Sequence, residues 1–245
     1  MNECLRSTMQ RLVSPSPAGA GSSRARAFAG SVICVAVLTL AHSAVLAGEI
    51  DTQVLDPKGH GAAGIVIIAE PDSRAAEPRT PRTAVMDQHN MQFVPEVLVI
   101  QTGSSVEFPN SDQILHQVYS FSAAKSFQLS LYAGRHYPPV LFDRPGLVTL
   151  GCNIHDQMIG YIYVTDSPFF GRTDSSGELR LQNLPAGHYT IKGWAPGLEG
   201  EDRRAGIQTQ VNVAAAGAVN ALLRLTHALR RSATPMSMDK RWVDY

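Results

Sequence analysis

The sequence has few cysteines, few aromatic residues and no excess of charge of either sign. Its 245 residues include three cysteines and 7% aromatic residues, and 21 Lys and Arg balance 21 Asp and Glu. Three cysteines cannot form a disulfide framework. A chain without a basic patch or abundant aromatic side chains lacks the groups that bind phosphates and stack on bases, so we predict no nucleic-acid partner. The 44% content of hydrophobic residues excludes a disordered tail protein.

The sequence has only one long hydrophobic run, near the N-terminus, which argues against a polytopic membrane protein. Residues 27–48 carry no charge, and the four arginines before them stand against a single acid, Glu3. A basic segment, an apolar run and small residues ending at Ala47 are typical of a secretory signal peptide. We therefore expect residues 1–47 to be cleaved and the protein to be periplasmic, with no membrane span after cleavage. The alternative is an uncleaved anchor, because a bilayer is spanned by roughly 20 apolar residues.

Removal of the signal would leave a single cysteine, Cys152. The remaining 198 residues carry 17 Lys and Arg and 20 Asp and Glu, a net charge of −3. A solitary thiol in an oxidising compartment is prone to reaction unless it is buried or bound. We therefore expect Cys152 to be held in one of these two ways.

Short apolar runs separated by Gly, Pro, Asn, Asp and Ser occupy most of the remaining chain. Runs of this length predict strands, and no segment keeps a 3.6-residue period long enough for a long helix. We expect residues 83–166 to form a β-sandwich, with further strands in residues 49–70 and 170–226 and a flexible tail at 227–245. The predicted fold class is all-β.

Three side chains able to bind metal lie on one short segment between two predicted strands. Cys152, His155 and Met158 follow the spacing Cys-x2-His-x2-Met. A tight loop can direct three side chains at one point, whereas neighbours on a strand point to opposite faces. One more imidazole would complete two His, one Cys and a weak axial Met, the ligand set of a blue-copper electron-transfer centre. The candidate is His116, which starts an apolar run 36 residues before Cys152.

The residues around these positions follow the patterns Gly-x-x-Val-x-Phe-x-Asn-x-Asp at 103–112, His-x-Val from 116, Pro-Gly at 145–146 and Met-x-Gly-Tyr-Ile-x-Val from 158. This combination resembles the plastocyanin-like cupredoxins, the short loop is similar to that of amicyanin, and the chain resembles bacterial methylamine utilization proteins. The resemblance implies a Greek-key sandwich that binds one type 1 copper ion through His116, Cys152 and His155, with Met158 as the axial ligand. It also implies that His155 is the electron port and that the partner is a cytochrome c or a periplasmic dehydrogenase.

One position departs from the family pattern. Family members commonly have Asn directly after the first ligand histidine, where its side chain holds the residue after the cysteine, and this chain has Gln117. We expect Asn153, the residue after Cys152, to supply a reciprocal contact. The hydrogen bonds around the ligands, and therefore the reduction potential, are where this chain is expected to differ from the family.

The C-terminal pattern Thr-Asp-x-x-Gly-x-x-x-Leu-x-x-Leu-Pro-x-Gly-x-Tyr at residues 173–189 resembles the carboxypeptidase regulatory-like β-sandwich. The strands that normally open this fold resemble residues 49–70, which come before the predicted cupredoxin. Our hypothesis is that the cupredoxin is inserted into one small sandwich made from residues 49–70 and 170–226. Insertion at a loop is tolerated because domain termini often lie close together.

The sequence is compatible with three functions. The first is electron transfer by a protein that is not an enzyme, the second is a copper carrier or store, and the third is a metal-free scaffold module. A hydrolytic Cys–His pair has no use for Met158 and would need an oxyanion hole or a helix N-terminus. Structural zinc would be unusual with a thioether, and a binuclear copper site needs two cysteines.

Overall fold

The computed structural model describes residues 47–73, 81–134 and 137–230. In these residues it contains 17 strands and one short helix, α1 (Gly200–Ala205), so the predicted all-β class is confirmed. No helix in the described segments is long and apolar enough to cross a bilayer. The expected signal peptide, apart from its last residue, and residues 231–245 of the expected tail lie outside the described residues.

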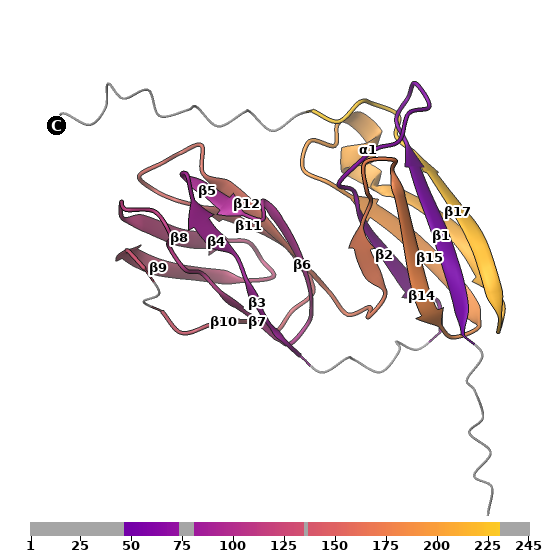
Figure 1. The fold of residues 1–245 in the computed structure, drawn as a ribbon, viewed down its shortest axis with the longest axis horizontal. Helices are drawn as coiled ribbons and strands as arrows, with labels where there is room; N and C mark the ends of the chain where they lie inside the picture. The colour runs from indigo at the N-terminus through magenta and orange to yellow at the C-terminus, as the bar shows by residue number, and fades with distance from the viewer. Residues whose placement is uncertain (1–46, 74–80, 135–136, 231–245) are drawn as a thin grey trace, which may run out of the picture. The chain divides into compact units, whose positions relative to one another are not determined.

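The middle of the chain forms what we call the central sandwich. Its strands are β3 (Thr83–Val85), β4 (Asp87–His89), β5 (Gln92–Val94), β6 (Val97–Gln101), β7 (Ser104–Glu107), β8 (His116–Phe121), β9 (Ser126–Tyr132), β10 (Val140–Phe142), β11 (Gly146–Gly151) and β12 (Ile159–Thr165). They form a five-stranded sheet in the order β6-β12-β11-β8-β9, a three-stranded sheet in the order β10-β7-β3 and the hairpin β4–β5 (Figure 1). One core fills the space between the sheets and includes Val106, Val118, Phe142, Val148 and Ile162.

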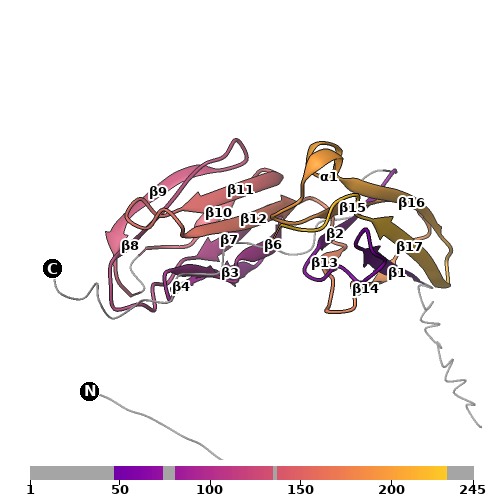
Figure 2. The ribbon, with the colours of Figure 1, turned by 90° about the horizontal axis from the view of Figure 1, so that it is seen from above.

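The pairing of β8 and β11 determines where the predicted ligands meet. β11 forms a hairpin with β12 and joins β8 at the pair Gly151↔Tyr119. A side chain at Gly151 would not fit, because a Cβ there would lie 2.7 Å from the Tyr119 ring. Both strands belong to the central sandwich (Figure 2). Since they are antiparallel, the loop that follows Gly151 runs beside the start of β8, where His116 lies.

The strands before and after the central sandwich form what we call the flanking sandwich. They are β1 (Gly48–Leu55), β2 (Val66–Pro71), β13 (Phe170–Arg172), β14 (Glu178–Leu184), β15 (Gly187–Trp194), β16 (Ile207–Val213) and β17 (Gly217–Arg224). Their sheets have the orders β14-β1-β17 and β13-β2-β15-β16. Each sheet combines strands from both sides of the central sandwich, as in the pair Ile191↔Ala69 of β15 and β2. Ile50, Ile67 and Ile191 belong to their common core.

Two turns of the flanking sandwich have the same hydrogen bonding. In each, an Asp Oδ1 accepts the amide hydrogens two and four residues later, and a glycine with positive φ stands three residues after the Asp. The first pairs Asp56 with Gly59 (φ 85°), and the second pairs Asp174 with Gly177 (φ 77°). A Cβ on Gly177 would lie 2.4 Å from the Val54 carbonyl oxygen, whereas a Cβ on Gly59 would meet nothing within 4 Å.

We predict that Gly177→Ala destabilises the protein much more than Gly59→Ala. Both variants place alanine in the left-handed region, at a cost of about 1–2 kcal/mol. Only Gly177→Ala adds a backbone clash that forces the turn away from β1, for which we expect about 2 kcal/mol more. Urea unfolding of the two variants measures the difference, and equal losses of unfolding free energy would contradict the close packing of the second turn.

Candidate metal centre

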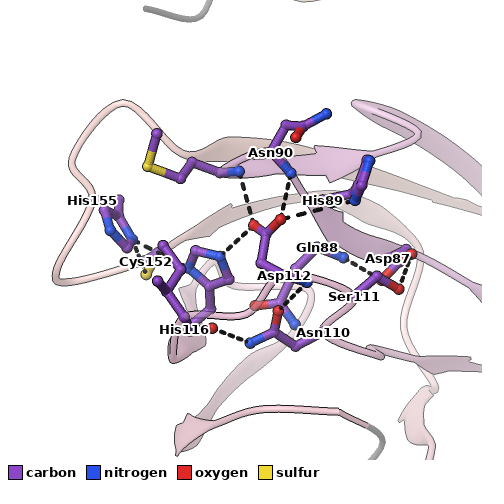
Figure 3. Close-up of polar contacts among 12 residues, drawn as sticks. Asp87, Gln88, His89, Asn90, Asn110, Ser111, Asp112, His116, Cys152 and His155 are labelled. Atoms are coloured by element: carbon purple, nitrogen blue, oxygen red, sulfur yellow. Dashed lines mark hydrogen bonds and ion pairs between the residues drawn. The ribbon is translucent and has the colours of Figure 1, made fainter. Parts of the chain in front are cut away.

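Three ligand atoms from His116, Cys152 and His155 converge in the central sandwich. Nδ1 of His116 lies 3.1 Å from Nδ1 of His155, and Sγ of Cys152 lies 3.7 Å from the same His155 nitrogen. His116 comes from the first residue of β8, while Cys152 and His155 come from the loop between β11 and β12 (Figure 3). In the part of the chain that the structure describes, this is the one group of three His, Cys or acidic residues whose ligand atoms all lie within 4.8 Å of one another.

Two of the three spacings are close to those around a single transition-metal ion, and the third pair, the Cys152 sulfur and the His116 ring nitrogen, lies within 4.8 Å. Bonds of about 2.0–2.1 Å to imidazole and 2.3 Å to thiolate would place the donors of a planar trigonal site roughly 3.5–3.8 Å apart. The nitrogen pair would need to separate by only a few tenths of an ångström. Two imidazoles and one thiolate in a trigonal arrangement are the donor set of blue-copper centres, so the residues present suit copper.

Met158 is the last residue of the same loop, directly before β12. The His155 amide donates to the Cys152 carbonyl oxygen at 3.3 Å, and the Met158 amide donates to the His155 carbonyl oxygen at 2.9 Å, so the loop is two successive tight turns. The Met158 side chain is buried in the same core cluster as Cys152. Its role as an axial ligand remains a prediction.

The site is closed to solvent at His116 and partly open at His155. The His116 side chain is 0% exposed and Cys152 is buried, whereas His155 has intermediate exposure. Burial and the neighbouring His116 ring together lower the pKa of His155. The neutral ring is therefore favoured, and this is the form that binds a metal.

Gln117 and Asn153 fasten the ligand loop to β8. Asn153 Nδ2 donates a hydrogen bond to Gln117 Oε1 at 2.6 Å, which is the reciprocal contact expected from the sequence. The Gln117 backbone N–H also donates to the Cys152 sulfur at 3.4 Å. This bond orients the sulfur and withdraws charge from a thiolate at that position.

Asp112 contacts a predicted ligand, a role that was not predicted from the sequence. Its Oδ2 accepts a hydrogen bond from His116 Nε2 at 2.7 Å, and its carboxylate also accepts the backbone N–H groups of Asn90 at 2.7 Å and Met91 at 2.9 Å (Figure 3). The available signal was the position of the acid in the Asn-x-Asp pattern, four residues before His116. The hairpin β4–β5, whose turn supplies the two amides, could not be connected to the ligand by sequence pattern alone.

Comparison with known proteins gives structural likenesses only. Neither a protein-family model nor a curated protein matches the chain. Among solved structures, a copper-containing nitrite reductase (NirK) from Thermus scotoductus SA-01 is 24% identical over 39% of this chain and 25% of its own length, with a TM-score of 0.33. A purple cupredoxin from Nitrosopumilus maritimus is 19% identical over 34% of this chain and 99% of its own, with a TM-score of 0.30.

A reduced amicyanin mutant is 21% identical over 40% of this chain and 98% of its own, with a TM-score of 0.31. This chain thus spans a quarter of the nitrite reductase and nearly all of the two smaller proteins. The scores are too low to assign the chain to a family.

We predict that Asn153→Ala loosens the ligand loop. The variant loses the hydrogen bond to Gln117, whose side chain is buried, and we expect the free energy of unfolding to fall by about 1 kcal/mol. Asn153→Asp is the matched control, because the Gln117 amide can rotate to donate to the new carboxylate. Chemical denaturation of the metal-free protein compares the variants, and a loss as large for Asn153→Asp as for Asn153→Ala would contradict this role.

Proposed function

We propose that this chain is a type 1 copper protein that transfers single electrons between redox partners and catalyses no reaction itself. One copper ion would be bound by His116, Cys152 and His155, with Met158 as a weak axial ligand. After cleavage of the signal at residues 1–47, the protein would act in the periplasm. The observation that carries the proposal is the convergence of two imidazole nitrogens and one sulfur at a buried point.

Copper bound there would supply a one-electron redox couple. A trigonal thiolate and bis-imidazole set lies between the geometries that Cu(I) and Cu(II) prefer, so the ion can change oxidation state with little rearrangement. The chain holds this set in place through the Gln117 and Asn153 contact and through Asp112. A rigid, buried site favours electron transfer over delivery, because a carrier must release its ion.

Exposed apolar side chains stand directly beside three of the proposed ligands. Leu115 precedes His116, Ile154 precedes His155 and Ile159 follows Met158, and each is about half exposed. Such side chains suit brief docking of a redox protein close to the partly exposed His155 ring. We propose a cytochrome c or a periplasmic dehydrogenase, in a methylamine or similar oxidation chain, as the partner.

The proposed function also gives the two sandwiches separate roles. We propose that the central sandwich is the cupredoxin, inserted between β2 and β13 of a carboxypeptidase regulatory-like sandwich. This proposal is supported by the strand pairing of β2 with both β13 and β15. The flanking sandwich would then serve as a spacer or docking module, and the half-buried Trp194, which packs against its core, as a structural residue.

The visible spectrum of the exported protein with one equivalent of Cu(II) tests the proposal. We expect an intense thiolate-to-copper band at about 600 nm, which Cys152→Ser abolishes while the His ligands still bind some metal. A protein that binds only colourless Cu(I) would be a carrier rather than an electron-transfer protein. Failure to bind stoichiometric copper would favour a metal-free scaffold.

Met158→Leu tests the axial ligand. We expect the coloured site to survive with a higher reduction potential, because loss of a weak sulfur donor destabilises Cu(II) more than Cu(I). Met86→Leu is the matched control, since Met86 is fully buried in the same core cluster but lies outside the ligand loop. Cyclic voltammetry of both variants gives the answer, and equal potentials would remove Met158 from the ligand set.

A further inference from the structure

We propose that Asp112 is a positioning residue that keeps the His116 proton on Nε2, leaves the Nδ1 lone pair free for the metal, and ties this ligand to the β4–β5 turn. The inference deepens the proposed function, since it concerns how one ligand of that site is prepared. It does not require the metal to be copper, because the same tautomer is needed for any ion bound through Nδ1.

The hydrogen bond between Asp112 and His116 dictates the tautomer. In a neutral imidazole one nitrogen donates and the other accepts, and an ionised carboxylate only accepts. His116 is completely buried, and its Nε2 lies 2.7 Å from Asp112 Oδ2. Nε2 must therefore carry the proton. Nδ1, which faces the other two ligand atoms, then has its lone pair directed into the cluster.

The contact between the two histidines agrees with this assignment. The Nδ1 atoms of His116 and His155 are 3.1 Å apart, a hydrogen-bond distance that requires one of them to donate. With the His116 proton on Nε2, the donor is the Nδ1–H of His155. A metal ion would take the place of that proton, which would move to Nε2 of the same neutral ring, so neither ring would have to turn.

The same carboxylate stabilises an unfavourable backbone turn. Asn90 and Met91, which connect β4 to β5, both have φ of 53°. The left-handed conformation is unfavourable for a residue other than glycine, and Met91 has no side-chain oxygen or nitrogen to offset it. Both amide hydrogens are accepted by Asp112, so the turn is held in place by the residue that orients His116.

Asp112 is itself fixed by Asn110. The Asn110 Oδ1 accepts the Asp112 backbone N–H at 3.0 Å, and Asn110 Nδ2 donates to the carbonyl oxygens of Ile114 and Tyr132 at 2.9 and 2.8 Å. The Asp112 side chain is only 13% exposed, so a substituted residue would have little water to replace its hydrogen bonds. The loop before β8 thus presents the carboxylate in one orientation.

The charge of Asp112 would also affect the reduction potential of a bound metal. A carboxylate that accepts the second proton of a ligand histidine increases the basicity of the ligating nitrogen. A more basic nitrogen favours the higher oxidation state, so Asp112 would lower the reduction potential of a bound copper ion. His89, whose Nδ1 lies 3.8 Å from Asp112 Oδ1, is an exposed neighbour and does not replace this contact.

Asp112→Asn is the central test. The Asn90 and Met91 amides and His116 Nε2 all donate to the Asp112 carboxylate, and the new side-chain NH2 group could only donate, so it cannot accept from them. In the metal-free protein, ¹⁵N chemical shifts of His116 should show the Nε2–H tautomer in the wild type and a substantial Nδ1–H fraction in the variant. Copper affinity should fall about 10- to 100-fold, and the reduction potential should rise. Asp143→Asn removes the same charge at an exposed side chain that pairs with Lys125, and should leave all three quantities unchanged.

Asp112→Glu is a rescue variant that retains a carboxylate and should recover part of the affinity and the Nε2–H tautomer. The inference is overturned if wild-type His116 carries its proton on Nδ1, a measurement that needs no variant to fold. It is also overturned if Asp112→Asn matches Asp143→Asn in tautomer, affinity and potential. A wild type without the thiolate-to-copper band but with the Nε2–H tautomer would refute the copper proposal and leave the role of Asp112 intact.

Discussion

The antiparallel pairing of β8 with β11 is the constraint on which the candidate site depends. It joins Gly151 to Tyr119, and it is possible because residue 151 has no side chain to collide with the tyrosine ring. The next residue along the chain is Cys152, and the antiparallel register brings it beside the start of β8. Residues that are 36 positions apart in the sequence thereby become neighbours. The loop spacing alone could not produce a metal site without this register.

Two hydrogen bonds to the proposed ligands would shift the reduction potential of a bound metal in opposite directions. The Gln117 backbone N–H donates to the Cys152 sulfur, which reduces the charge that a thiolate can give to an oxidised metal. The Asp112 carboxylate accepts from His116, which increases the charge that the imidazole can give. The reduction potential would therefore depend on the balance of these two contacts. Both come from the segment between Asp112 and Gln117, so one short stretch of chain tunes two ligands.

The all-β class could be predicted from local patterns, whereas the convergence of His116 with the Cys152 loop, 36 residues away, was expected from the family resemblance. Cys152, His155 and Met158 lie within seven residues, and short apolar runs between turn residues predict strands. The contact between Gln117 and Asn153 was expected because each residue directly follows a ligand. The role of Asp112 was not predictable in this way. It depends on the turn at Asn90 and Met91, more than 20 residues earlier, and the backbone conformation of that turn is not evident from the sequence because Met91 is a residue type that usually avoids positive φ.

The proposed function requires that the Cys152 sulfur and the imidazole nitrogens of His116 and His155 bind one copper ion. X-ray absorption at the copper edge of the protein loaded with one equivalent reports the ligand atoms directly. We expect one short Cu–S bond and two Cu–N bonds with imidazole scattering, in both oxidation states and with little change between them. A first shell of nitrogen and oxygen alone, without sulfur, would contradict it.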